Sequence, residues 1–217
     1  MSGEMGLRER KKRRTYETIS DTAIALFLEK GFDRVPVAAI AEAAEVSKPT
    51  LFRYFPAKED LVLHRFADHR EEAARVVAGR PEGVGPLEAL HRRFTDGLAR
   101  RDPVTGLCDD PDVLAFHRLL YGTPSLVARL YAYQGASEAA LAEALAGSAP
   151  GAGAPGAAGP AGVRERLAAG QIVAVQRILA EENWRRIAAG EPAGAVEPDA
   201  VAAAALAFRQ LAEGLEL

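Results

Sequence analysis

Apolar residues recur at helical spacing along most of the chain, and the alternation of apolar and polar residues typical of strands is nearly absent. Ala and Leu, two good helix formers, fill many of the apolar positions. Gly and Pro separate the helical stretches. We therefore predict an all-α fold, whose later helices cover residues 86–101, 111–121, 125–146, 163–190 and 198–215.

The first part of the chain predicts a group of helices joined by short turns. An apolar stripe marks the first helix, and Gly31 is suited to end it. Ser47 is a suitable N-cap for the third helix, which Pro56 ends. The four expected helices cover residues 15–30, 37–44, 48–55 and 57–78.

A turn of three to four residues separates the second and third helices, which is the spacing of a helix-turn-helix. In this motif the second helix of the pair lies in the major groove of DNA and leads with its N-terminal residues. The helix at 48–55 has the two faces that this task needs. Leu51 and Phe55 are expected to anchor one face to a small core, which consists of Ile19, Phe27, Ile40 and Val46.

The polar face of the third helix supplies candidate contacts to DNA. Lys48 can reach a base acceptor or a phosphate, and the hydroxyl of Tyr54 can reach a phosphate. Ser47 places a hydroxyl beside backbone N–H groups that favour an anion. Lys58, one turn into the next helix, would add a phosphate contact. The predicted DNA-binding residues are Ser47, Lys48, Thr50, Arg53, Tyr54 and Lys58.

These residues also bear a specific resemblance. The segment LFLEKGFDRVPVAAIAEAAEVSKPTLFRYFPAKEDL, residues 26–61, resembles the DNA-binding domain of the tetracycline-repressor (TetR) family, because many positions agree in register. The resemblance implies a homodimeric repressor that leaves a palindromic operator in double-stranded DNA when a small-molecule effector binds its C-terminal domain. It covers under a third of the chain.

The segment departs from the family pattern at three places. Val35-Pro36 stands where a capping Thr is usual, and Ala38 stands where Arg or a polar residue is common. Glu45 replaces the Gly of the turn. If Glu45 has left-handed backbone angles, it costs roughly 1 kcal/mol. These departures predict that base readout depends on the third helix and on the basic N-terminus.

Charge is distributed unevenly along the chain. The formal net charge is −3, yet all five Lys lie within the first 58 residues and basic residues crowd residues 8–14. This pattern favours a polyanionic partner for the front of the chain, or a solubilising tail. Residues 10–14 would enter a minor groove, or would only add salt-dependent affinity.

We expect three regions along the chain. Residues 1–14 form a basic arm, 15–60 a helix-turn-helix domain, and 61–217 a domain for ligand binding and dimerisation. Within the last region, residues 147–162 are rich in Gly, Ala and Pro and read as a flexible linker. This linker contains G-x-G-x-x-G, but no strand precedes it, so we reject a dinucleotide site.

The C-terminal region offers candidates for an effector pocket and for a dimer interface. Apolar walls with a few polar groups suit a small-molecule site. Core packing is the competing explanation for each candidate: His91, Phe94, Phe116, His117, Leu120, Tyr121 and Trp184. The last two helices carry small and apolar residues, which suits either a four-helix bundle across a two-fold axis or an ordinary core.

Several other classes of protein are disfavoured by the sequence. No apolar run approaches the ~18 residues that cross a bilayer, and the single Cys108 fits a reducing cytoplasm. The four His show no metal-ligand spacing, and no nucleophile motif or phosphate-binding loop is present. We expect a cytoplasmic transcriptional regulator that needs no metal or cofactor and is not an enzyme. The alternative is a helical small-molecule-binding scaffold or interaction protein without specific DNA readout.

Overall fold

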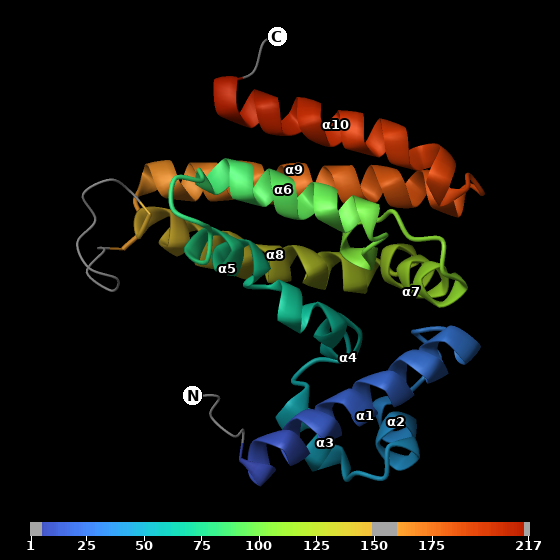
Figure 1. The fold of residues 1–217 in the computed structure, drawn as a ribbon. Coiled ribbons are helices and arrows are strands. Elements are labelled where there is room, and N and C mark those ends of the chain that lie inside the picture. Colours follow the sequence, from blue (N-terminus) through green and yellow to red (C-terminus); the bar gives the residue numbers. More distant parts are fainter. Residues whose placement is uncertain (1–5, 149–159, 215–217) are drawn as a thin grey trace. The chain divides into compact units, whose positions relative to one another are not determined.

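The computed structural model describes residues 6–148 and 160–214, and every regular element in these ranges is helical (Figure 1). In chain order the elements are α1 (Leu7–Lys30), α2 (Val37–Ala43), α3 (Lys48–Tyr54), α4 (Asp60–Leu63), η1 (His64–His69), α5 (Glu72–Ala78), α6 (Pro86–Ala99), η2 (Pro103–Thr105), α7 (Pro111–Gly122), α8 (Pro124–Ala146), α9 (Val163–Ala188) and α10 (Ala193–Glu213). The prediction of an all-α fold is confirmed. Of the expected linker at 147–162, residues 149–159 lie outside the described residues.

The described chain divides into two compact units. The first unit contains the residues up to 67 together with 115–131, and the second contains 68–114 and the residues from 132 onwards. Helices α7 and α8 therefore contribute residues to both units. The expected boundary near residue 60 did not include the return of 115–131 to the first unit, since hydrophobic spacing does not reveal which core a helix joins.

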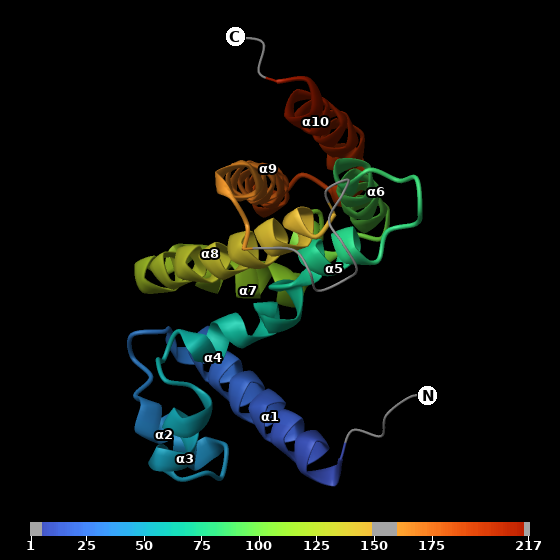
Figure 2. The same cartoon turned by 90° about the vertical axis from the view of Figure 1, so that its left-hand side faces the viewer.

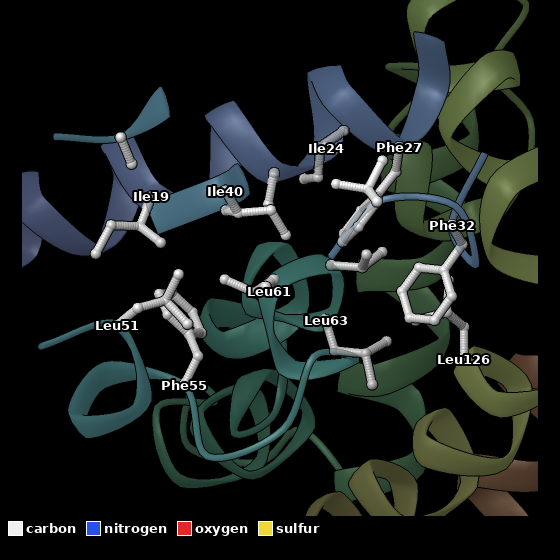
Figure 3. Packing of buried hydrophobic residues seen from close by; sticks show 14 of the residues in the cluster. Ile19, Ile24, Phe27, Phe32, Ile40, Leu51, Phe55, Leu61, Leu63 and Leu126 are labelled. Carbon is white, nitrogen blue, oxygen red and sulfur yellow. The ribbon is translucent and has the colours of Figure 1, made fainter. Parts of the chain in front are cut away.

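The core of the first unit forms where α1, α2, α3 and α4 meet (Figure 3). Ile19 and Phe27 on α1 are buried together with Ile40 on α2 and with Leu51 and Phe55 at the end of α3. The anchoring of α3 to this core is confirmed, although Val46 is only partly buried. Helix α1 is longer than predicted, because it begins at Leu7 and so includes all the basic residues that were expected to precede it.

The turn between α2 and α3 has the geometry of a helix-turn-helix. Glu45 has a φ of 54°, and the N–H of Val46 donates to the carbonyl of Ala41 at 2.9 Å. This pairing ends α2 with a left-handed residue, as helices commonly end. Ser47 then caps α3, because its Oγ accepts a hydrogen bond from the N–H of Thr50 at 3.2 Å.

The single helix predicted over 57–78 is wrong. That stretch contains α4, the 3₁₀ segment η1 and α5. Leu61, Val62 and Leu63 are all buried. Consecutive residues of a helix point in different directions, so a helix packed on one face only would not bury all three. The carbonyl of Leu61 also accepts a hydrogen bond from buried Ser20 at 2.7 Å. Contacts on several sides thus interrupt a pattern that reads as one helix.

The second unit is built around three long helices. Helix α10 packs along both α6 and α9, and α5 packs on α6 (Figures 1 and 2). The shared core contains Leu90, Leu98 and Phe208. Helix α10 begins five residues earlier than predicted, because Pro198 lies inside the helix instead of starting it. No described helix is long and apolar enough to cross a membrane.

Candidate nucleic-acid interface

Helix α3 has one face in the core and one face in solvent. Leu51 and Phe55 are buried on the inner face, whereas Lys48, Phe52 and Arg53 are exposed. The buried pair is spaced four residues apart, which fixes the rotation of this short helix about its axis. The exposed side chains are therefore held in a defined direction.

The N-terminal end of α3 presents two linked hydroxyl groups. The Ser47 hydroxyl accepts the Thr50 N–H and donates its own proton to Thr50 Oγ1 at 2.8 Å. Because Thr50 Oγ1 accepts in this pair, its own proton can be donated to an outside acceptor. A phosphate oxygen is an acceptor of this kind.

Two cations of α3 lie beside aromatic rings. The Nζ of Lys48 is 5.9 Å from the centroid of the Phe52 ring, and the guanidinium carbon of Arg53 is 5.6 Å from the centroid of Tyr54. Cations at this distance are attracted by the negative face of a ring. These contacts restrict both cations while leaving them exposed.

Tyr54 connects α3 to α1. Its ring meets Tyr16 edge to face, with centroids 4.7 Å apart, and Tyr16 also stacks on His64 at 5.1 Å. Tyr54 is half-buried. The predicted contact residue therefore also helps to pack the unit, and a test of its hydroxyl must leave the ring in place.

Lys58 makes its contacts within the first unit. Its Nζ donates to the carbonyl of Phe32 at 2.5 Å and lies 4.4 Å from the centroid of the Phe32 ring. Burial lowers the pKa of this amine below its ordinary value, against the opposing charges of Asp33 and Glu59. Lys58 thus joins the segment after α3 to the end of α1. A phosphate contact from Lys58 stays a prediction, and it competes with this internal hydrogen bond.

The basic residues at 10–14 lie on the first turns of α1 and are exposed. Arg13 forms an exposed ion pair with Glu17 at 3.4 Å, and Thr18 donates to the carbonyl of Arg14 at 2.9 Å. A basic arm ahead of the first helix was the expectation. The structure instead presents them on a helix, since their backbone continues the hydrogen bonding of α1.

The seven predicted pocket residues are divided between the two units. His91, Phe94 and Trp184 belong to the second unit, where His91 stacks on Phe208 at 4.9 Å. The other four belong to the first unit: Phe116, His117, Leu120 and Tyr121. That these residues line an effector pocket stays a prediction, because helical periodicity does not show which unit a helix joins.

His117 is the buried titratable group in this set. The ring is 7% exposed, and burial lowers its pKa from 6.5 to about 4. It lies between Phe116 and Tyr121, with ring centroids 6.1 and 6.0 Å away. His117 is therefore neutral in the folded protein near neutral pH.

A surface hollow of about 410 Å³, not predicted from the sequence, lies between α8 and α9. Its lining residues are Gly135, Glu138, Ala139, Val163, Arg166 and Leu167. Val163 and Leu167 are exposed. The apolar spacing in the sequence does not show whether such residues are exposed or buried. Within the described residues, no group of three or more His, Cys, Asp or Glu is arranged to hold a metal ion.

Comparisons with known proteins agree with the helix-turn-helix geometry. Residues 19–64 match the family described as bacterial regulatory proteins, tetR family. The chain is 36% identical over 142 residues to the HTH-type transcriptional regulator TcmR of Streptomyces glaucescens, and the match covers 65% of this chain and 63% of that regulator. It thus spans less than two thirds of the regulator's length.

Two further similarities extend beyond the matched domain. The chain is 42% identical over 132 residues to MftR of Mycobacterium tuberculosis, a proposed regulator of mycofactocin biosynthesis, across 57% of this chain and 67% of that protein. GusR of Salmonella enterica has a similar structure, with a TM-score of 0.54 and 20% identity, over 96% of this chain and 97% of that chain. At this identity the likeness shows the fold.

Proposed function

Because the chain belongs to the TetR family of bacterial regulatory proteins, we propose that it is a sequence-specific DNA-binding transcriptional regulator. In this proposal it is a cytoplasmic homodimer that represses transcription from a palindromic operator and leaves the DNA when a small-molecule effector binds. The observation that supports DNA reading most directly is the orientation of α3. Its inner face is locked into the core, and Ser47, Lys48 and Arg53 are exposed to solvent.

The residues on α3 divide into two kinds of contact. Lys48 reads a base acceptor or a phosphate, and Ser47, Thr50 and the Tyr54 hydroxyl position the helix on the backbone. Arg53 and the exposed cations at 10–14 add phosphate contacts whose strength falls with salt. Their helical presentation supports an electrostatic role and does not require entry into a minor groove.

The dimer proposal follows from the small size of one DNA-binding domain, which we call a reading head. One α3 of seven residues contacts few base pairs, whereas two heads related by a two-fold axis read half-sites one helical turn apart. Ile178 on α9 and Leu206 on α10 are 55% and 47% exposed. Exposed apolar side chains on these two helices support a four-helix bundle between protomers.

Effector release is a linkage between two binding sites. DNA and effector favour different states of the protein, so each weakens the binding of the other by the same factor. The proposed effector contacts remain His91, Phe94 and Trp184 in the second unit and, in the first, Phe116, His117, Leu120 and Tyr121.

Selection from a pool of randomised duplexes tests the proposal. We expect the protein to retain a palindromic site, and we expect a Lys48→Met/Tyr54→Phe double variant to lose it. Phenylalanine removes only the hydroxyl and keeps the ring that packs on Tyr16. Retention of DNA without any sequence preference, equally in both proteins, would support the alternative of a ligand-binding scaffold with a basic surface.

A further inference from the structure

Phe52 is an apolar side chain on the outer face of α3. Its side chain is 40% exposed, while its neighbour Leu51 is buried in the core. The Nζ of Lys48, one helical turn earlier, lies 5.9 Å from the centroid of the Phe52 ring. Cation and ring therefore form one mixed surface on the helix that is proposed to enter the major groove.

The major groove offers a specific partner to such a ring. Base edges there carry hydrogen-bond donors and acceptors, and the 5-methyl group of thymine is the apolar group that side chains such as Phe contact. A phosphate gains nothing from Phe52, because the ring has no donor. The chemistry of the ring thus selects a base and not the backbone.

We propose that Phe52 reads a thymine through its 5-methyl group, and that Lys48 reads an acceptor on a nearby base pair. The inference rests on the proposed function and specifies part of the operator. Four residues along a helix span about 6 Å, and stacked bases are about 3.4 Å apart, so the two contacts fall within about two base pairs. Because Lys commonly pairs with the O6 and N7 of guanine, each half-site contains a thymine close to a guanine.

Replacement of thymine by deoxyuridine tests this directly, since it removes the methyl group and preserves base pairing. Each thymine of the selected operator is replaced in turn, symmetrically in both half-sites, and binding is measured at constant salt. For the wild-type protein we expect one position at which affinity falls about fourfold per half-site, the effect of one buried methyl group. Phe52→Ala binds both duplexes equally, whereas Phe52→Leu keeps part of the discrimination.

A matched control is available in the same unit. Leu28 on α1 is 43% exposed, so Leu28→Ala removes a similar exposed apolar group away from α3. We expect this variant to show the wild-type response to deoxyuridine. Thermal melts of all variants are compared, and the ratio of the two affinities within each variant is independent of any change in the fraction folded.

The outcomes separate the inference from the proposed function. Failure to recover any palindromic site contradicts the proposed function itself. Recovery of a site at which no thymine is sensitive to the loss of its methyl group overturns the role of Phe52 and leaves the regulator intact. Equal sensitivity of wild type and Phe52→Ala has the same meaning, because another group then contacts the methyl.

Discussion

Glu45 holds a backbone conformation that its residue type disfavours. Its φ of 54° follows from the reversal between α2 and α3, and its side chain is exposed. Lys58 and His117 are likewise explained by their surroundings, since one amine donates to a carbonyl and one imidazole is buried. At the residue scale, the fold of the first unit thus explains the backbone of Glu45 and the environments of Lys58 and His117.

Glu45→Gly is expected to stabilise the first unit by roughly 1 kcal/mol, because glycine adopts positive φ without the steric cost. Glu42→Gly is the control. Glu42 is an exposed residue inside α2, where glycine costs about 1 kcal/mol relative to alanine. Hydrogen exchange of the α2 and α3 amides measures both changes. Destabilisation by Glu45→Gly would show that its side chain contributes more than the strain removes.

Lys58→Met is expected to destabilise the first unit by about 1 kcal/mol, because it removes the hydrogen bond to the Phe32 carbonyl. Lys48→Met is expected to leave stability unchanged and to weaken DNA binding, since Lys48 is exposed. The measurements are amide exchange and the slope of DNA affinity against salt. A smaller salt slope for Lys58→Met would instead assign Lys58 a phosphate contact.

Acid is expected to destabilise the first unit through His117. Its pKa falls from 6.5 to about 4 on folding, so below pH 6.5 the unfolded chain takes up a proton that the folded chain refuses. Stability is lost as the pH drops through this window, by about 3 kcal/mol in total, and no further loss from this group occurs below about pH 4.

Comparison with His117→Phe isolates this effect, because the carboxylates titrate alike in both proteins. The difference in the free energy of unfolding between the two proteins is expected to vary between pH 6.5 and about 4 and to level off outside that window. If this free-energy difference stays constant across the window, folding does not shift the pKa of His117.

At the scale of elements, η2 and α9 meet in a buried contact within the second unit. Asn183 on α9 donates through Nδ2 to the carbonyl of Thr105 at 2.9 Å, and both residues are buried. Gly106 follows with a φ of 73°, and a Cβ at this position would lie 1.9 Å from the carbonyl oxygen of Ala180. Only glycine allows this approach of backbone to backbone.

Gly106→Ala is therefore expected to destabilise the second unit by at least about 3 kcal/mol, from left-handed strain and overpacking combined. Trp184 is the single tryptophan of the chain, and its backbone N lies beside this position. Its fluorescence during urea unfolding therefore measures the loss of stability. Gly135→Ala on α8 is the control. A Cβ there meets nothing within 4 Å, and alanine is expected to be neutral or mildly stabilising.

At the scale of the whole molecule, the proposed function depends on pairing two copies. Two paired DNA-binding domains contact two half-sites, whereas a single domain has only the affinity for one half-site. Exposed apolar residues on α9 and α10 are the surface from which we propose this pairing. Stability of the second unit and operator affinity are then both dependent on protein concentration.

Ile178→Glu combined with Leu206→Glu is expected to shift the protein to monomer and to lower operator affinity at least about tenfold, because charges would be buried at the interface. Light scattering and operator titration measure the two effects. Val104→Glu makes the same kind of change, apolar to charged, at a residue 38% exposed on η2, and is expected to leave both unchanged. A double variant that remains dimeric would place the interface on another surface.

The sequence by itself determined the helical class, the limits of most helices and the helix-turn-helix, because these depend on local spacing. Lys48 and Arg53 give the short helix a charged face. The sequence therefore already indicated that Leu51 and Phe55, on its other face, are buried. The sequence also identified Ser47 as a cap and Glu45 as the position of strain.

Tertiary structure alone decided the features that depend on contacts distant in sequence. Residues 115–131 return to the first unit, so Phe116 and His117 belong to a different unit from His91 and Phe94. Lys58 binds a carbonyl 26 residues earlier, and burial on several sides divides 57–78. Periodicity describes which face of a helix is apolar, but it does not name the partner that covers that face.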